Sequence, residues 1–157
     1  MTIAQSIEYI VNRIGASPSL PIPSLFTFLK ADSNFQNLLA DEAFFPLCYL
    51  DAPMIGTLDE KTLKINYEIR LVFLRKSQLE WNWNQHEVLL NYTEAYCREF
   101  VKLCQNIDPN DSGISGISNV RILEVVNLFD VNATGHYLTA RISTTNPKTC
   151  FNENLEE

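Results

Sequence analysis

The stretch Thr62–Lys76, TLKINYEIRLVFLRK, is the longest strictly alternating segment of the sequence. Apolar side chains occupy every second position, which is the period of a β-strand with one buried face. We therefore expect a long central strand, and none of its residues has an evident chemical role. The apolar positions are Leu63, Ile65, Tyr67, Ile69, Leu71 and Phe73, and the polar positions between them are Lys64, Asn66, Glu68 and Arg70.

The polar side of this strand changes character along its length. Val72 and Leu74 interrupt it at the far end, which indicates that the strand is covered on both faces there or meets a partner. Lys64, Glu68 and Arg70 form the rest of that side. A solvated strand face is the simpler interpretation of these three residues, and a contact with another protein is the alternative.

Length and composition restrict the class of protein. A chain of 157 residues suits one domain with one hydrophobic core. Its 46% hydrophobic and 20% charged residues match globular proteins rather than disordered or fibrous ones. The longest aliphatic or aromatic run, Leu71–Leu74, is far shorter than the roughly 20 residues that span a bilayer. We therefore expect no membrane segment. We also expect the protein to stay in the cytoplasm after synthesis, because no basic leader precedes an apolar block at the N-terminus.

Charge and cysteine spacing exclude further classes. The net charge of −7 argues against a nucleic-acid-binding surface, which needs clustered cations to displace counterions from phosphate. Solubility explains the acidity, and a surface past which DNA slides without binding is the alternative. We expect free, mostly buried thiols rather than disulfides or a zinc site, because the cysteines are widely spaced and lack a histidine at ligand spacing. They are Cys48, Cys97, Cys104 and Cys150.

The segments before the central strand combine one clear helix with ambiguous stretches. Apolar residues from Ile3 to Ile14 are spaced as on one face of an amphipathic helix, and Gly15 follows where a C-terminal cap belongs. Ala16–Ser24 carries several prolines, which predict a stiff connector. Leu25–Ala43 fits either a short helix or an irregular strand.

Phe44–Leu50, FFPLCYL, has the composition of a second strand. Because Pro46 has no N–H for a ladder, we expect an edge strand, or one that begins after the proline. The turn-rich segment Asp51–Lys61 then leads into the central strand, so that the two strands pair antiparallel.

After the central strand the apolar period becomes helical, with Ser77 and Glu80 as a candidate capping box. Trp81 and Trp83 lie near the start of this helix, about 200° apart around its axis. Both indoles therefore cannot face the core, and an exposed one would suit a protein–protein contact. The alternative is a helix that begins later, preceded by a capping loop that folds both indoles inward.

The C-terminal third predicts a loop and a hairpin. Asn106–Ser118, NIDPNDSGISGIS, has no apolar period and indicates a mobile loop. Asn119–Phe129 and His136–Thr145 are predicted strands around a turn at Asp130–Gly135. The order of elements is therefore α, β, β, α, β, β. It predicts an α+β fold in which an antiparallel sheet of about four strands, in two hairpins, packs against two helices. Residues 1–146 form the single domain, and residues 147–157 form a loose acidic tail.

Neither histidine has surroundings typical of catalysis. His86 lies early in the predicted long helix and is expected on its exposed face, and His136 opens the last strand beside a turn. The sequence contains no G-x-S-x-G, P-loop, G-x-G-x-x-G or H-E-x-x-H motif. We expect no catalytic residue, no cofactor and no metal, and hence no enzyme.

In the order of these segments and in their residue patterns, the sequence resembles the small head–tail joining and tail-terminator ring proteins of tailed bacteriophages, of the type found in phages of Bacteroidetes hosts. The likeness covers Thr2 to Asn146. It has no signature motif, and Ala16–Ser24 and Leu25–Ala43 depart from the pattern. It rests on the N-terminal helix, FFPLCYL, TLKINYEIRLVFLRK, the following helix, and the pair NVRILEVVNLFD and HYLTARIST.

The resemblance implies a non-enzymatic virion protein of the neck or tail, assembled in the host cytoplasm as a closed ring, commonly a hexamer or dodecamer. It also implies contacts with neighbouring ring proteins and a DNA channel without specific binding. Asp108–Ser118 is the expected contact between rings. An acidic interaction protein, such as a toxin-immunity protein, is the alternative, and a small α+β enzyme or ligand-binding domain would require an apolar pocket with a convergent His or Cys. The candidate subunit-contact residues are Lys64, Glu68, Arg70, Trp81, Trp83, Asp108, Asn110 and Asp111.

Overall fold

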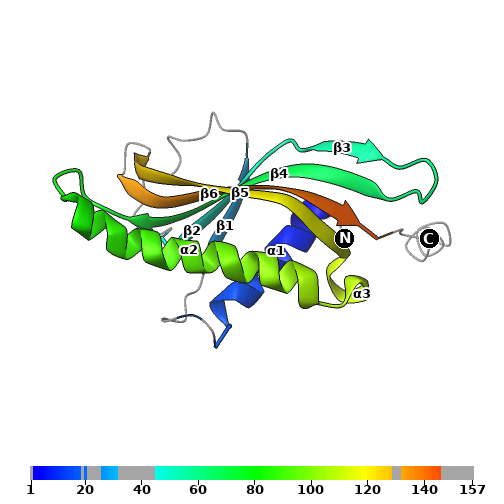
Figure 1. Cartoon of the computed structure of the whole chain (residues 1–157), viewed down its shortest axis with the longest axis horizontal. Helices are drawn as coiled ribbons and strands as arrows, with labels where there is room; N and C mark the ends of the chain where they lie inside the picture. Colours follow the sequence, from blue (N-terminus) through cyan, green and yellow to red (C-terminus); the bar gives the residue numbers. More distant parts are fainter. Residues whose placement is uncertain (1, 19, 21–25, 32–44, 129–131, 146–157) are drawn as a thin grey trace.

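The computed structural model of the protein describes residues 2–18, 20, 26–31, 45–128 and 132–145. These residues form an α+β fold, as predicted, with one mixed sheet and helices packed on one of its faces (Figure 1). The elements are α1 (Ile3–Gly15), β1 (Thr27–Ala31), β2 (Leu47–Asp51), β3 (Ile55–Leu58), β4 (Ile65–Lys76), α2 (Trp83–Asn106), α3 (Pro109–Ser112), β5 (Ile114–Leu128) and β6 (Ala133–Thr144).

The sheet is built around β4, the strand expected from the alternating stretch. The strand order is β1-β2-β4-β6-β5, and β3 also pairs with β4. β6 follows one edge of β4 from Asn66 to Lys76. On the other edge β3 pairs with Ile65–Glu68 and β2 with Leu71–Leu74, so that β2 and β3 lie one after the other. All of these pairs are antiparallel, whereas β1 runs parallel to β2.

The prediction of about four antiparallel strands was therefore wrong in its details. β1 lies in the segment that was ambiguous between helix and strand, and β3 lies in the segment expected to be a turn-rich connection. β2 begins directly after Pro46 but is an interior strand between β1 and β4, not an edge strand. Because the proline precedes the ladder instead of interrupting it, its missing N–H does not exclude an interior position.

The main core lies between the sheet and the helices. The apolar side of β4 faces α1 and α2, and the Phe73 ring lies 6.2 Å from Tyr96 and 6.3 Å from Phe100, both on α2. Burying each large apolar side chain contributes roughly 1.5–3 kcal/mol, so this layer supplies most of the hydrophobic stabilisation. Buried residues in it include Ile7, Ile10, Val11, Ile14, Ile69, Leu71, Phe73, Tyr96, Phe100, Leu138 and Ile142.

The opposite face of the sheet has a smaller apolar cluster. Val72 and Leu74 are buried there together with Leu47, Tyr49 and Ala133. This confirms that the far end of β4 is covered on both faces. The near end differs, because β4 begins at Ile65 and Leu63 lies outside it with a φ of 59° and an exposed side chain.

The long helix begins later than the Ser77–Glu80 capping box predicted. Its N-cap is Asn82, whose side chain accepts a hydrogen bond from the Gln85 backbone N–H, while the Gln85 side chain accepts one from the Asn82 N–H. Asn and Gln at this spacing accept hydrogen bonds from the same unpaired backbone N–H groups at the helix start as Ser and Glu would. Ser77 is instead buried against the turn of the last hairpin, where its hydroxyl donates to the Asn132 carbonyl.

The predicted mobile loop Asn106–Ser118 is mostly ordered. It contains the short helix α3 and the start of β5, which begins at Ile114. Gly113 joins the two with a φ of 78°, a left-handed conformation that glycine adopts without a Cβ penalty. The predicted hairpin is present, but β5 begins at Ile114 instead of Asn119, and β6 begins at Ala133, inside the predicted turn. Part of the turn, together with the predicted acidic tail, lies outside the described residues.

Candidate subunit-contact surfaces

The first candidate surface is the sheet face opposite the helices. Glu68 and Arg70 are exposed there, while Lys64 is half-buried just before β4. The Arg70 guanidinium lies over the ring of Tyr137 on β6, 4.1 Å from its centroid. The structure therefore leaves two of the three predicted contact residues accessible, and only Arg70 has a neighbouring ring that fixes its position.

Strand register gathers further arginines on this face. Thr139 of β6 lies between Arg70 of β4 and Arg121 of β5, and Arg141 lies opposite Glu68. Alternation places these side chains on the side of the sheet away from the helices. A hollow of about 460 Å³ beside Thr139 is lined partly by Glu68 and Arg121. Sequence reasoning missed this grouping because the arginines are far apart in the chain and meet only through register.

The two tryptophans differ in exposure, although only Trp83 lies on the helix that the spacing argument assumed for both. Trp81 is half-buried and its ring lies 5.6 Å from that of His86. Trp83 is 54% exposed, and its Nε1–H donates to Glu87 Oε1 at 2.8 Å, one helical turn away. The late start of α2 was the alternative prediction, but the inward fold of both indoles is wrong, because the Trp83 side chain is exposed.

The prediction of an exposed His86 is also wrong. The side chain is 3% exposed, and Nδ1 lies 3.0 Å from Thr134 Oγ1. The Thr134 hydroxyl donates to Ser77 Oγ, and the Ser77 hydroxyl donates to the Asn132 carbonyl. Because each hydroxyl has a single proton, this direction requires His86 Nδ1–H to be the first donor. The chain of bonds ties the start of α2 to the last hairpin.

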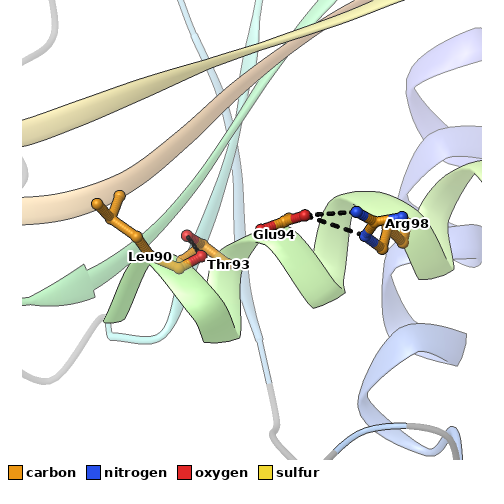
Figure 2. Close-up of polar contacts among 4 residues, drawn as sticks. All are labelled: Leu90, Thr93, Glu94 and Arg98. Carbon is orange, nitrogen blue, oxygen red and sulfur yellow. Dashed lines mark hydrogen bonds and ion pairs between the residues drawn. The ribbon is translucent and has the colours of Figure 1, made fainter. Parts of the chain in front are cut away.

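His136 belongs to a second buried contact between α2 and β6. Its Nδ1 lies 2.7 Å from Thr93 Oγ1, and the Thr93 hydroxyl donates to the Leu90 carbonyl (Figure 2). Burial lowers the pKa of His136, and the carboxylates of Glu124 and Glu94 oppose that shift. A buried imidazole held by one threonine has the surroundings of a structural group, since a general base needs access to a substrate.

The thiols are buried as predicted where the structure describes them. Cys48, Cys97 and Cys104 are free. Burial raises the pKa of Cys97 and of Cys104 to about 12, and that of Cys48 also rises well above its usual value. These thiols remain protonated near neutral pH and are poor nucleophiles. Cys150 lies outside the described residues. No group of three or more potential metal ligands occurs within the described part of the chain.

A groove between α2 and β5 is the second candidate surface. It encloses about 470 Å³, and its apolar lining includes Val101 of α2 with Val120 and Ile122 of β5. Arg98 and Lys102 line it as well. Arg98 is held by Glu94 through two N–H donors, at 2.6 and 3.1 Å (Figure 2). β5 is an edge strand, so the groove lies along an outer border of the sheet.

The hairpin formed by β3 and the start of β4 is the third candidate surface. Ile55 is 76% exposed, and Leu58 and Leu63 are each 54% exposed. The turn between the strands starts at Asp59, whose Oδ1 accepts the Lys61 backbone N–H at 2.9 Å. That bond and the one from the Thr62 N–H lower the pKa of Asp59. In Figure 1 this hairpin extends past the end of α2 and diverges from β5.

The predicted contact residues near α3 have local roles as well. Asp108 is the N-cap of α3 and accepts the Asn110 backbone N–H at 2.9 Å. Asn110 and Asp111 are exposed. The structure does not bring these residues together with Trp83 or Arg70 into one surface, because they lie at the end of α2 opposite Trp83.

Comparisons with known proteins add no family assignment. A scan against protein-family models finds no match for this chain, and a search of curated proteins finds none either. Within the described residues, no helix combines the length and apolar character that a membrane span needs.

Proposed function

We propose that this protein is a structural component of a tailed-bacteriophage virion that forms a closed ring in the neck or tail, as a head–tail connector or tail terminator. The observation that carries the proposal is the pair of apolar surfaces on opposite borders of one sheet. The β3–β4 hairpin projects beside β2, and the α2–β5 groove lies at the far edge. Two different surfaces of this kind suit head-to-tail contacts, which close into a ring when the rotation between subunits permits.

The buried reactive groups support a structural role over a chemical one. His86 and His136 connect α2 to β6 through threonines, and the described thiols lie in the core. Large exposed apolar side chains on a small domain are typical of interaction surfaces. The resemblance of the predicted segment order to the phage ring proteins is the further support for this proposal.

The remaining features of the proposal concern the assembled ring. A hexamer or dodecamer would surround the DNA channel and contact neighbouring ring proteins, with the segment Asp108–Ser118 as the contact between rings. The net charge of −7 suits a channel that does not retain DNA. Because the sheet face with Arg70 and Arg121 is comparatively basic, we propose that this face is turned away from the channel.

Light scattering of the purified protein across a concentration series, combined with negative-stain imaging, tests the proposal. Closed rings with a uniform subunit number are the expected result. Open fibres, or compact dimers at all concentrations, would contradict it. A matched measurement at raised salt separates apolar contacts, which persist, from contacts between surface charges, which weaken.

A further inference from the structure

We infer that residues 146–157 of this chain fold back across the sheet face opposite the helices and bind the arginines on it. We call this surface the open face. The inference goes beyond the proposed function, because it concerns a contact within one subunit. The occupant of the open face is thus an acidic segment of the same chain. A second copy or another acidic protein would give different results in the experiments.

The open face has positive charge that the described residues leave unpaired. Strand register places Arg70, Arg121 and Arg141 there on the neighbouring strands β4, β5 and β6. Within the described part of the chain, none of the three forms an ion pair. The carboxylates on this face are Glu68 and the half-buried Asp51, so the arginines outnumber them. A guanidinium binds a carboxylate through several fixed donors, which makes an acidic segment the matching partner.

Residues 146–157, NPKTCFNENLEE, provide the opposite charge. They contain Glu153, Glu156 and Glu157 against the single cation Lys148. The part FNENLEE contains no cation at all. Oppositely charged groups on one chain need little intrinsic affinity to associate, because the covalent connection holds them at an effective concentration on the order of millimolar.

The exit of the chain from β6 allows the segment to reach the arginines. Thr145 still donates its backbone N–H to the Gly113 carbonyl at 3.0 Å. Asn146-Pro147 follows, a dipeptide that favours a turn and cannot continue the ladder. If an extended chain returns antiparallel to β6 from that point, Glu153 comes level with Ala140, in the row of the three arginines, because both strands rise about 3.3 Å per residue.

The open face also offers an apolar contact to the same segment. Helices pack on the other face of the sheet, which leaves the open face accessible (Figure 1). Leu123 is 62% exposed, and its partner on β6 is Tyr137. In an extended segment Leu155 lies on the same side as Glu153, and the reversal described above brings it level with Leu138, next to Tyr137. Leu155 can therefore cover Leu123 while the carboxylates meet the arginines.

Disulfide trapping tests whether the segment reaches this face. The double variant Leu123→Cys/Leu155→Cys, in a Cys150→Ser background, should form a cross-link with oxidised glutathione. The product should have the mass of a monomer, and its rate of formation should not depend on protein concentration. Val88→Cys/Leu155→Cys in the same background is the matched control, because Val88 is 54% exposed on α2, on the other side of the sheet. The described native cysteines are buried and do not compete.

Charge exchange tests whether the arginines hold the segment. Arg121→Glu in the trapping variant should slow cross-linking about fivefold, the scale of an exposed ion pair. Adding Glu153→Arg should restore the rate, because it rebuilds the pair with the charges exchanged. Lys61→Glu is the control for net charge, since Lys61 is exposed in the turn between β3 and β4 and should leave the rate unchanged. Equal slowing by Arg121→Glu and Lys61→Glu would contradict a specific contact.

The mass of the product separates this inference from its alternatives. Cross-linking at dimer mass only would assign the segment to a second copy and overturn the inference. Equal trapping in the Leu123 and Val88 variants, or none in either, would also overturn it. Because the expected product is a monomer, an absence of rings in solution would contradict the proposed function without affecting this contact. Selective monomeric trapping at Leu123, slowed by Arg121→Glu and restored by Glu153→Arg, supports the inference.

Discussion

The two halves of β4 share one alternating pattern but have different surroundings. From Leu71 to Leu74 the strand lies between β2 and β6, and the apolar side chains on both faces are buried. From Ile65 to Glu68 it lies between β3 and β6, and none of its residues is fully buried. Alternation thus predicts the conformation of the strand, but the elements that cover it decide how much each side chain contributes.

This difference separates a half of the strand that is buried on both faces from a half whose side chains are only partly buried or exposed. Substitutions in the buried half should lower the free energy of unfolding strongly. Substitutions at the exposed end should affect assembly and leave stability almost unchanged. The predictions below test that division, beginning with the largest expected effect.

The tightest position along the buried half is opposite Leu74. A Cβ added at Gly135 of β6 would lie 1.8 Å from the Phe73 carbonyl oxygen. Gly135→Ala should therefore force the two strands apart and lower the free energy of unfolding by more than about 4 kcal/mol, or abolish folding. Gly116→Ala is the control, because a Cβ there meets nothing within 4 Å. Urea unfolding followed by circular dichroism measures both, and equal stabilities would contradict the prediction.

Side-chain truncation compares the two halves directly. Phe73 is fully buried and contacts the rings of Tyr96 and Phe100. Phe73→Ala should reduce the free energy of unfolding by about 3–5 kcal/mol, because it removes the buried ring and leaves a cavity. Ile55→Ala, in the strand that pairs with the exposed half, should cost less than about 0.5 kcal/mol. Chemical denaturation distinguishes them, and a large loss for Ile55→Ala would mean that the hairpin is covered within the single chain.

A purely local interaction should have a smaller effect. Asn82 caps α2 by accepting the Gln85 N–H at 3.0 Å. Asn82→Ala should lower stability by about 1 kcal/mol, the usual value of an N-cap. Asn84→Ala, two residues further along the exposed first turn, should change it little, since alanine is a better helix former. The same denaturation assay applies, and a loss of several kcal/mol would indicate that Asn82 has a tertiary role.

Protonation of His136 should have the smallest effect, because Glu124 and Glu94 oppose the influence of burial on its pKa. The folded-state pKa is lowered from 6.5, so the unfolded chain binds more protons between these two values. This contribution to stability is present above about pH 6.5 and is lost as the pH falls toward the folded-state pKa. Comparing wild type with His136→Gln at about pH 7.5 and about pH 5.5 isolates it. A greater loss on acidification in the variant than in the wild type would contradict the sign.

Much of the secondary structure was predictable because its signals are local. The apolar stripe of Ile7, Ile10 and Ile14 predicted α1 to within a residue of its observed end. The alternation around Leu138 predicted β6. The start of α2 was misjudged because Ser77–Glu80 and Asn82–Gln85 both fit a capping pattern. Only the packing of Ser77 against Asn132 distinguishes between them.

The candidate surfaces were harder to anticipate. Helical spacing predicted that one of Trp81 and Trp83 would be exposed, and the structure shows that it is Trp83. The groove between Val101 and Ile122 was not, because it joins a helix and a strand that are distant in the sequence. Burial of His86 was missed for the same reason, since its partner Thr134 lies on the last hairpin.

The sequence by itself determined an α+β class, the central strand and the two long helices, because side-chain periods of two and 3.6 residues follow from backbone geometry. The tertiary structure decided that β1 runs parallel to β2, that β3 pairs with the start of β4, and that both histidines are buried. Those outcomes depend on which distant segments pair and pack. A local period contains no information about them. The same alternating strand can be covered on one face or on both, and distant segments of the chain decide which.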